Sequence, residues 1–133
     1  MNITGNTIVG VALECFPEAL PNYEAMVKEW HGEFPGTYNV FYEVFRPLLS
    51  IALQENDLLL QQRFSQFFEI VLRDGDAEAQ NVIWLKIFKW LFGQKNLLEL
   101  FLPVCGPATR RAMRNAAFRW NVSWSMRLKL LLC

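Results

Sequence analysis

The sequence predicts an all-α fold, a compact bundle of about six or seven helices arranged as antiparallel helix hairpins in one domain spanning residues 1–133. Hydrophobic residues make up 53% of the 133 residues, above the roughly 45–50% typical of globular domains, so one core can form. Between short runs rich in Gly and Pro, these residues recur at the three- and four-residue intervals of a helix. No long linker divides the sequence. We expect the core at about residues 37–120 and a tail at residues 121–133.

The first part of the chain is expected to hold two shorter helices and one longer one. The shorter helices cover residues 7–16 and 22–31, with two prolines between them. The longer helix covers residues 37–54, where polar residues recur every three or four positions and define one solvent-facing stripe. These residues are Asn39, Glu43, Arg46, Ser50 and Gln54. Pro47 lies inside this helix and has no backbone N–H, so we expect a kink there or a split into two helices.

The next two helices are expected to form a central hairpin. Asp57 is placed to cap the first of them, whose buried face carries apolar residues at helical spacing. These are Leu60, Phe64, Phe67, Phe68 and Val71, and the opposite face carries Gln61, Gln62, Ser65, Gln66 and Glu69. Asp76 caps the second helix, and Gly93 ends it at the C′ position. Residues 82–92 are apolar nearly all round, which places this helix at the centre of the bundle. The link from Arg73 to Asp76 is short enough for an antiparallel hairpin.

Two more helices are expected after Gly93. A short one covers residues 96–104, and a second begins at Pro107 and runs to about Trp120. The inward side of the second helix carries Ala112, Met113, Ala116 and Ala117. Together, the expected hairpins give a HEAT-like arrangement.

The tail has a different pattern. Apolar and polar residues alternate from Val122 to Leu130, which is typical of a strand, although Met, Arg, Leu and Lys also favour a helical or frayed extension. A strand would pair with the N-terminal segment, with a second copy of the chain or with a partner.

The formal net charge is zero, because 13 basic residues balance 13 acidic ones, and this disfavours a globally basic nucleic-acid-binding protein. The apolar content and the zero net charge also exclude intrinsic disorder. The charges are nevertheless segregated along the chain. Residues 1–80 hold twelve acids and four bases, a net charge of −8, and residues 81–133 hold nine bases and one acid, a net charge of +8. This split indicates either a charged surface for a partner or two halves that neutralise each other in the fold.

A soluble cytoplasmic protein is expected. The three cysteines, Cys15, Cys105 and Cys133, have no metal-binding spacing and are expected to be free thiols in a reducing compartment. The N-terminus lacks the basic region of a signal peptide, and no apolar stretch reaches the roughly 20 residues that span a bilayer. We therefore expect no membrane association, no metal and no other cofactor.

The sequence holds no catalytic constellation, so we expect a protein that is not an enzyme. His31 is the single histidine, which leaves no Ser-His-Asp or Cys-His arrangement, and the glycines form no phosphate-binding motif. His31 itself is expected to have a capping or surface role at a helix end. Residues 74–78 faintly resemble a calcium loop, but the later glycine and glutamate of such a loop are missing, which favours a turn followed by an N-cap.

Two sets of charged residues are candidates for binding. The acids of the first part of the chain are expected to form a surface that attracts a basic partner. The basic candidates are Arg110, Arg111, Arg114 and Arg119. The first three share one helix face, where they would contact phosphates or else cover the acids of the first half. Tyr38 and Tyr42, one helical turn apart, are a further candidate for an interface edge.

Two segments within residues 64–120 resemble a family of small all-helical bacterial immunity proteins: FSQFFEIVLRDGDAEAQNVIWLKIFKWLFG and LLELFLPVCGPATRRAMRNA. Members of that family show a helix, a short acidic Gly-Asp turn, a helix containing Asn-Val-Ile, and a leucine-rich stretch that closes in a Gly-Pro-x-Thr-Arg turn. The matching residues are Gly75, Asp76, Asn81, Val82, Ile83, Gly106, Pro107, Thr109 and Arg110. The resemblance covers under half of the chain, and most of the matching positions are structural ones.

The resemblance implies a protein that binds one cognate toxin domain of a polymorphic or contact-dependent growth-inhibition system and blocks it by occlusion. Many such toxins are nucleases with basic substrate-binding faces, which an acidic surface complements. The acids expected to form this surface lie around the helix ends of the central hairpin. They are Glu43, Glu55, Asp57, Glu69, Asp74, Asp76 and Glu78.

Two other functions stay open. A nucleic-acid-binding module would use the basic region from Arg110 to Lys129 and would bind in a salt-sensitive way. A helical scaffold would associate with further copies of itself through the alternating tail. Binding to a toxin domain is the expectation that we favour, and the sequence leaves the oligomeric state open.

Overall fold

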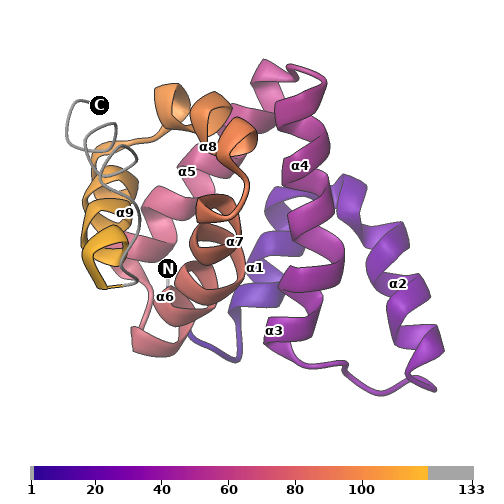
Figure 1. Ribbon diagram of the computed structural model, residues 1–133. Coiled ribbons are helices and arrows are strands. Elements are labelled where there is room, and N and C mark those ends of the chain that lie inside the picture. The colour runs from indigo at the N-terminus through magenta and orange to yellow at the C-terminus, as the bar shows by residue number, and fades with distance from the viewer. Residues whose placement is uncertain (1, 120–133) are drawn as a thin grey trace.

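The computed structural model describes residues 2–119, and over that range the chain is all-helical (Figure 1). Several of the helices continue directly into one another, so that they form seven continuous helical segments, as the sequence predicts. The α-helices are α1 (Ile8–Cys15), α2 (Leu20–Glu29), α3 (Thr37–Val40), α4 (Arg46–Gln54), α5 (Leu58–Asp74), α6 (Ala77–Ile83), α7 (Lys89–Phe92), α8 (Lys95–Phe101) and α9 (Pro107–Arg119). Short 3₁₀ turns cover Pro17–Ala19 and Leu102–Val104.

The longest helix, α5, lies at the centre of the bundle and packs against α1, α4, α6 and α9. Its predicted apolar face is confirmed, because all five of its predicted apolar residues are buried. Three of them, Phe64, Phe67 and Phe68, belong to a cluster of aromatic rings that joins α5 to neighbouring segments. Phe64 stacks on Phe16 with ring centroids 4.1 Å apart, and Phe68 meets Phe88 and Phe101 edge-on. Aromatic rings in edge-on or offset contact contribute beyond the area that they bury.

Pro47 does not split the helix over residues 37–54. A π-helical turn at Phe41–Phe45 joins α3 to α4, and the Arg46 N–H donates to the carbonyl of Phe41, five residues back. Pro47 cannot donate to Glu43, and its ring would crowd that carbonyl in a regular helix. The wider π turn relieves this conflict, so the predicted kink takes the form of a π turn.

A second π-helical turn, at Trp84–Phe88, joins α6 to α7 and packs against the first one. The continuous helix through α6 and α7 also contacts α5, α8 and α9, which confirms its predicted central position. Its buried residues include Val82, Ile87 and Leu91. The helix ends at Phe92, but Gly93 has a φ of −86°, so the freedom of glycine to adopt a left-handed conformation is not used there.

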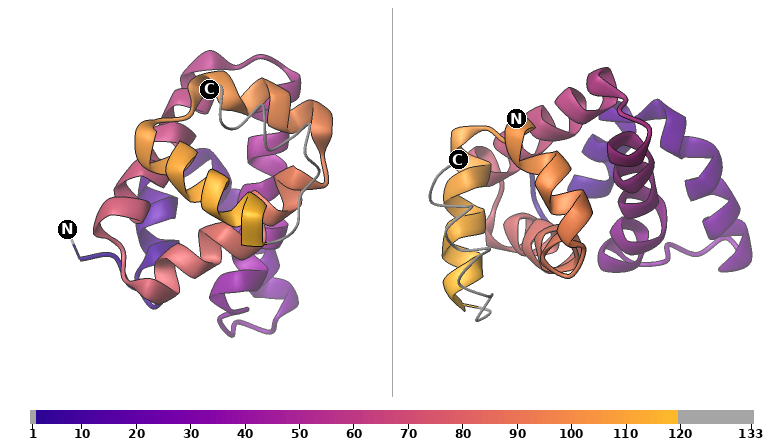
Figure 2. Two further views of the ribbon diagram at one scale, coloured as in Figure 1. Left: turned by 60° about the vertical axis from the view of Figure 1, so that its left-hand side comes forward. Right: turned by 45° about the horizontal axis from the view of Figure 1, so that its top comes forward.

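The two ends of the described chain are tied to the bundle in different ways. Near the N-terminus, Ile3 is fully buried and its carbonyl accepts a hydrogen bond of 2.8 Å from the Asp76 N–H, in an isolated bridge to the α5–α6 turn. At the other end, the predicted inward residues of α9 are all buried against the core. Figure 2 shows that α2 and α9 lie on opposite sides of the bundle. The predicted tail at residues 121–133 lies outside the described residues.

In residues 2–119, every helix is too short or too polar to cross a lipid bilayer. The same residues hold no group of three His, Cys, Asp or Glu side chains placed to bind a metal ion.

Candidate functional site

The turn between α4 and α5 is a tight and well-bonded corner, which we define as residues 51–59 and call the α4–α5 corner. Asn56 adopts a φ of 55°, a left-handed conformation that asparagine tolerates better than most residues. The backbone N–H of Asp57 then donates to the carbonyl of Ala52 over 3.0 Å. The Asp57 side chain accepts a 3.1 Å hydrogen bond from the Leu60 N–H, which confirms its predicted capping role. These contacts hold the corner in one shape.

Gln61 fixes the same corner from inside. It was expected on the polar face of α5, and that expectation is wrong, because only 3% of Gln61 is exposed. Its Nε2 donates a hydrogen bond of 2.9 Å to the carbonyl of Ala52. Buried polar side chains need such partners, and Gln61 finds this one because α4 ends directly beside the start of α5. The amide therefore joins the end of α4 to the first turn of α5.

The outer side of the α4–α5 corner exposes three large apolar side chains. Leu59 is 63% exposed, Leu58 is 57% exposed, and Ile51 is 48% exposed. The acids Glu55 and Asp57 lie between them in sequence and are exposed as well. An apolar centre beside charged groups is the usual composition of a surface that binds another protein.

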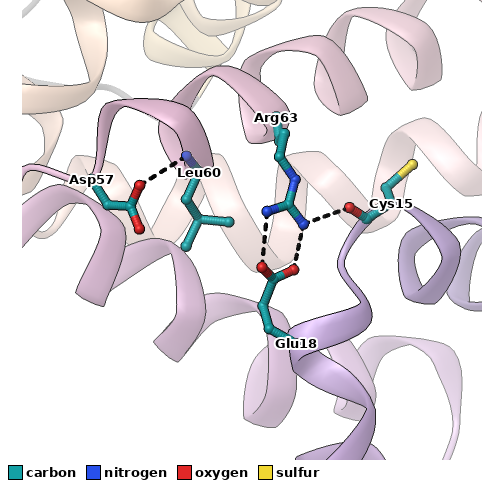
Figure 3. Close-up of polar contacts among 5 residues, drawn as sticks. All are labelled: Cys15, Glu18, Asp57, Leu60 and Arg63. Atoms are coloured by element: carbon teal, nitrogen blue, oxygen red, sulfur yellow. Dashed lines mark hydrogen bonds and ion pairs between the residues drawn. The ribbon is translucent and has the colours of Figure 1, made fainter.

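One turn further along α5, Arg63 is engaged in a different contact. Figure 3 shows its guanidinium directed at the carboxylate of Glu18 and at the carbonyl of Cys15, and Asp57 turned toward Leu60. The hydrogen bond from Arg63 lowers the pKa of Glu18, and the same bond raises the pKa of Arg63. Arg63 and Glu18 therefore neutralise each other. Among residues 2–119, neither Glu55 nor Asp57 has an ion-pair partner, so the corner keeps its negative charge.

Glu69, predicted for the acidic surface, instead caps α9. Its carboxylate accepts hydrogen bonds from the Ala108 N–H at 3.0 Å and from both the N–H and the hydroxyl of Thr109 at 2.7 Å each. Burial by itself raises the pKa of Glu69, but these three hydrogen bonds outweigh it, and the net pKa lies below its ordinary value. Gly106 makes this cap possible, because a Cβ there would overlap the carboxyl group of Glu69.

Two further acids on the predicted surface also have structural partners. Asp76 caps α6 by accepting a 2.8 Å hydrogen bond from the Ala79 N–H, as predicted. Glu78 accepts a hydrogen bond of 2.7 Å from the hydroxyl of Tyr38, which in turn accepts one from Asn81. Burial and this bond to Glu78 raise the pKa of Tyr38.

Glu43 and Asp74 are exposed and have no hydrogen-bond or ion-pair partner within residues 2–119. They lie on different elements, on the π turn before α4 and at the end of α5. Of the seven predicted acids, Glu55 and Asp57 are exposed at the α4–α5 corner, and Asp74, Asp76 and Glu78 are exposed around the α5–α6 turn.

The predicted basic residues divide between two sides of α9. Arg111 is exposed, and Arg119 lies over the ring of Trp84 at 5.2 Å from its centroid. Arg110 and Arg114 are half-buried, and the Nε of Arg110 is buried with no partner in the described part of the chain. No ion pair joins an acid of residues 2–80 to a base of residues 81–119. Within residues 2–119, the two halves of the chain therefore do not neutralise each other through direct ion pairs.

No protein-family model, no curated protein and no solved structure matches this chain.

Glu55 and Asp57 were predicted from the sequence as binding residues, whereas the three exposed apolar residues beside them were not. The sequence did contain a signal, because Leu58, Leu59 and Leu60 are consecutive and only Leu60 fits the buried face of α5.

The predicted interface edge at Tyr42 also exposes a large side chain beside a charged one. The guanidinium of Arg46 lies 4.2 Å from the centroid of the exposed Tyr42 ring and 5.2 Å from that of Trp90.

Proposed function

We propose that this chain is a cytoplasmic immunity protein, not an enzyme, which binds one cognate toxin domain and occludes its active or substrate-binding site. The single observation that carries the proposal is the rigid α4–α5 corner, which presents Leu58 and Leu59 to solvent beside Glu55 and Asp57. The resemblance of residues 64–120 to immunity proteins gives additional support.

The apolar part of the corner supplies a source of affinity. Burying the exposed part of one leucine side chain contributes about 1 kcal/mol, because it removes apolar area from water. Leu58 and Leu59 lie in the first turn of α5 and point about 100° apart around its axis, so the partner contacts them with two adjacent parts of its surface. Because hydrogen bonds already hold the corner in one shape, little conformational entropy is lost on binding.

The acidic part of the corner selects the partner. A nuclease domain binds the phosphates of its substrate through a basic face, and two exposed carboxylates with no ion-pair partner in residues 2–119 attract such a face. Charge attraction raises the rate of association, which suits a protein that must reach a toxin before its substrate does. The proposed partner is therefore a basic toxin domain with an apolar site beside its substrate-binding surface.

Size-exclusion chromatography and calorimetric titration with the toxin domain encoded beside this chain test the proposal. We expect a stoichiometric complex, and we expect Leu59→Ser to weaken it about tenfold or more. Phe34→Ser is the matched control, because Phe34 is similarly exposed, at 55%. It precedes the continuous helix over residues 37–54, whereas the α4–α5 corner lies at the other end of that helix. No complex at micromolar concentration would contradict the proposal, and so would equal loss of affinity in both variants.

A further inference from the structure

A groove lies between α9, the C-terminal end of α5, and the helix that runs through α6 into the π turn at Trp84. Its volume is about 310 Å³. The described residues that line it are Leu72, Arg73, Gln80, Trp84, Ala108, Arg111, Ala112 and Asn115. We propose that this α9 groove binds a phosphate group.

The charge of the α9 groove supports this proposal. Arg73 and Arg111 both line it, and no acid is present among its described lining residues. Neither arginine has an ion-pair partner within residues 2–119. Arg119 adds a third positive charge beside the groove, over the ring of Trp84. A phosphate monoester carries about −1.5 to −2 charges at pH 7, which complements several cations better than the single charge of a carboxylate.

The polar groups of the groove are largely donors of hydrogen bonds. Two guanidinium groups present planar sets of N–H donors, which match the oxygens of a phosphate. Gln80 is held in place because its Nε2 donates to the carbonyl of Gly75 over 3.0 Å. The indole of Trp84 also lines the groove, and its Nε1 is buried with no hydrogen-bond partner among the described residues.

Two acids lie near Arg73 on α5: Asp74, the next residue, is exposed, and Glu69 already has hydrogen-bond partners. Glu69, one helical turn before Arg73, directs its carboxylate to the first turn of α9. Arg73 donates from Nε to the main-chain carbonyl of Glu69 over 3.3 Å, a contact that leaves its two terminal nitrogens for a ligand. On α9, Ala108 and Ala112 line the groove with small side chains, which leave space for the group attached to the phosphate.

The inference does not depend on the proposed function. The groove lies at the C-terminal end of α5 and the α4–α5 corner at its N-terminal end, and a helix of 17 residues separates its ends by about 25 Å. The phosphate belongs either to a small phosphorylated metabolite, as a monoester, or to the backbone of a nucleic acid, as a diester with a single negative charge, because both present non-bridging phosphate oxygens to the two arginines.

Nuclear magnetic resonance of the indole N–H signals tests the proposal. We would titrate the ¹⁵N-labelled protein with inorganic phosphate at constant ionic strength and identify the Trp84 signal with the Trp84→Phe variant. We expect phosphate to shift the Trp84 signal, and we expect Arg111→Gln to weaken binding about tenfold or more. Arg114→Gln is the matched control, because Arg114 lies on the same helix but does not line the groove. Circular dichroism would check that both variants keep their helices.

Two further titrations separate the sources of the phosphate. A mononucleotide that binds as tightly as a single-stranded oligonucleotide indicates a metabolite. An oligonucleotide that binds more tightly, with an affinity that falls steeply as salt rises, indicates a nucleic acid. The proposal is overturned if phosphate leaves the Trp84 signal unchanged, if acetate shifts it equally at the same concentration, or if Arg114→Gln weakens binding as much as Arg111→Gln.

Discussion

At the scale of single residues, Glu69 shows how an apparent surface acid becomes a structural one. Three hydrogen bonds attach its carboxylate to the start of α9, and α9 covers one side of α5. The donors come from residues 39 and 40 positions later in the chain. A negative charge at a helix N-terminus also interacts favourably with the helix dipole. Glu69 therefore holds α9 in its place.

Glu69→Gln is expected to lower the free energy of unfolding at pH 7 by about 1–2 kcal/mol, because the amide keeps only part of the cap. The pKa of Glu69 is lowered in the folded protein, so its stabilising contribution is fully present above the ordinary value of 4.5 and is lost as pH falls through the folded pKa. Urea unfolding at pH 7 and at lower pH measures the difference between the two proteins. A difference that does not shrink below pH 4.5 would contradict the capping role.

At the scale of elements, helix starts were predictable because short-range chemistry sets them. Asp57 and Asp76 each accept a hydrogen bond from an N–H three residues later, so the local sequence contains the whole signal. The burial of Gln61 was not predictable from helical spacing, because its partner, Ala52, belongs to the previous helix. Similarly, the π turn before Pro47 needs both the proline and a neighbouring helix, which packs against it with a π turn of its own.

Two glycine substitutions distinguish the effect of helix propensity on stability from the effect of a contact between two helices. Gly10→Ala lies inside α1, where an added Cβ meets nothing, so we expect stabilisation by about 0.5–1 kcal/mol from better helix propensity. Gly106→Ala should destabilise by about 1–2 kcal/mol, because the new methyl group displaces the Glu69 cap. Denaturant unfolding measures both changes.

A double-mutant cycle tests whether the loss of stability in Gly106→Ala comes from the displaced Glu69 cap. In the Glu69→Gln background, Gly106→Ala should have a smaller effect, because much of the cap is already lost. Additive effects of the two substitutions would show that the methyl group acts through some other contact.

At the scale of the whole molecule, the two differently charged parts of the chain meet along α5. Its N-terminal end adjoins the corner that carries Glu55 and Asp57, and its C-terminal end adjoins the groove that carries Arg73 and Arg111. The sequence predicted the helical fold and the existence of the charge split. It did not predict which charges stay free, because Glu69 and Glu78 bind groups about forty residues away in the chain.

The proposed function is tested most directly by growth rescue in cells that express a candidate toxin domain, such as one whose gene neighbours the gene of this chain. The wild-type chain should restore growth, the Leu58→Ser and Leu59→Ser double variant should lose most of this protection, and Phe34→Ser should keep it. We expect this order because Leu58 and Leu59 lie on the proposed binding surface, whereas Phe34, although also exposed, lies outside it. Failure of the wild-type chain to protect, or full protection by the double variant at equal expression, would contradict it.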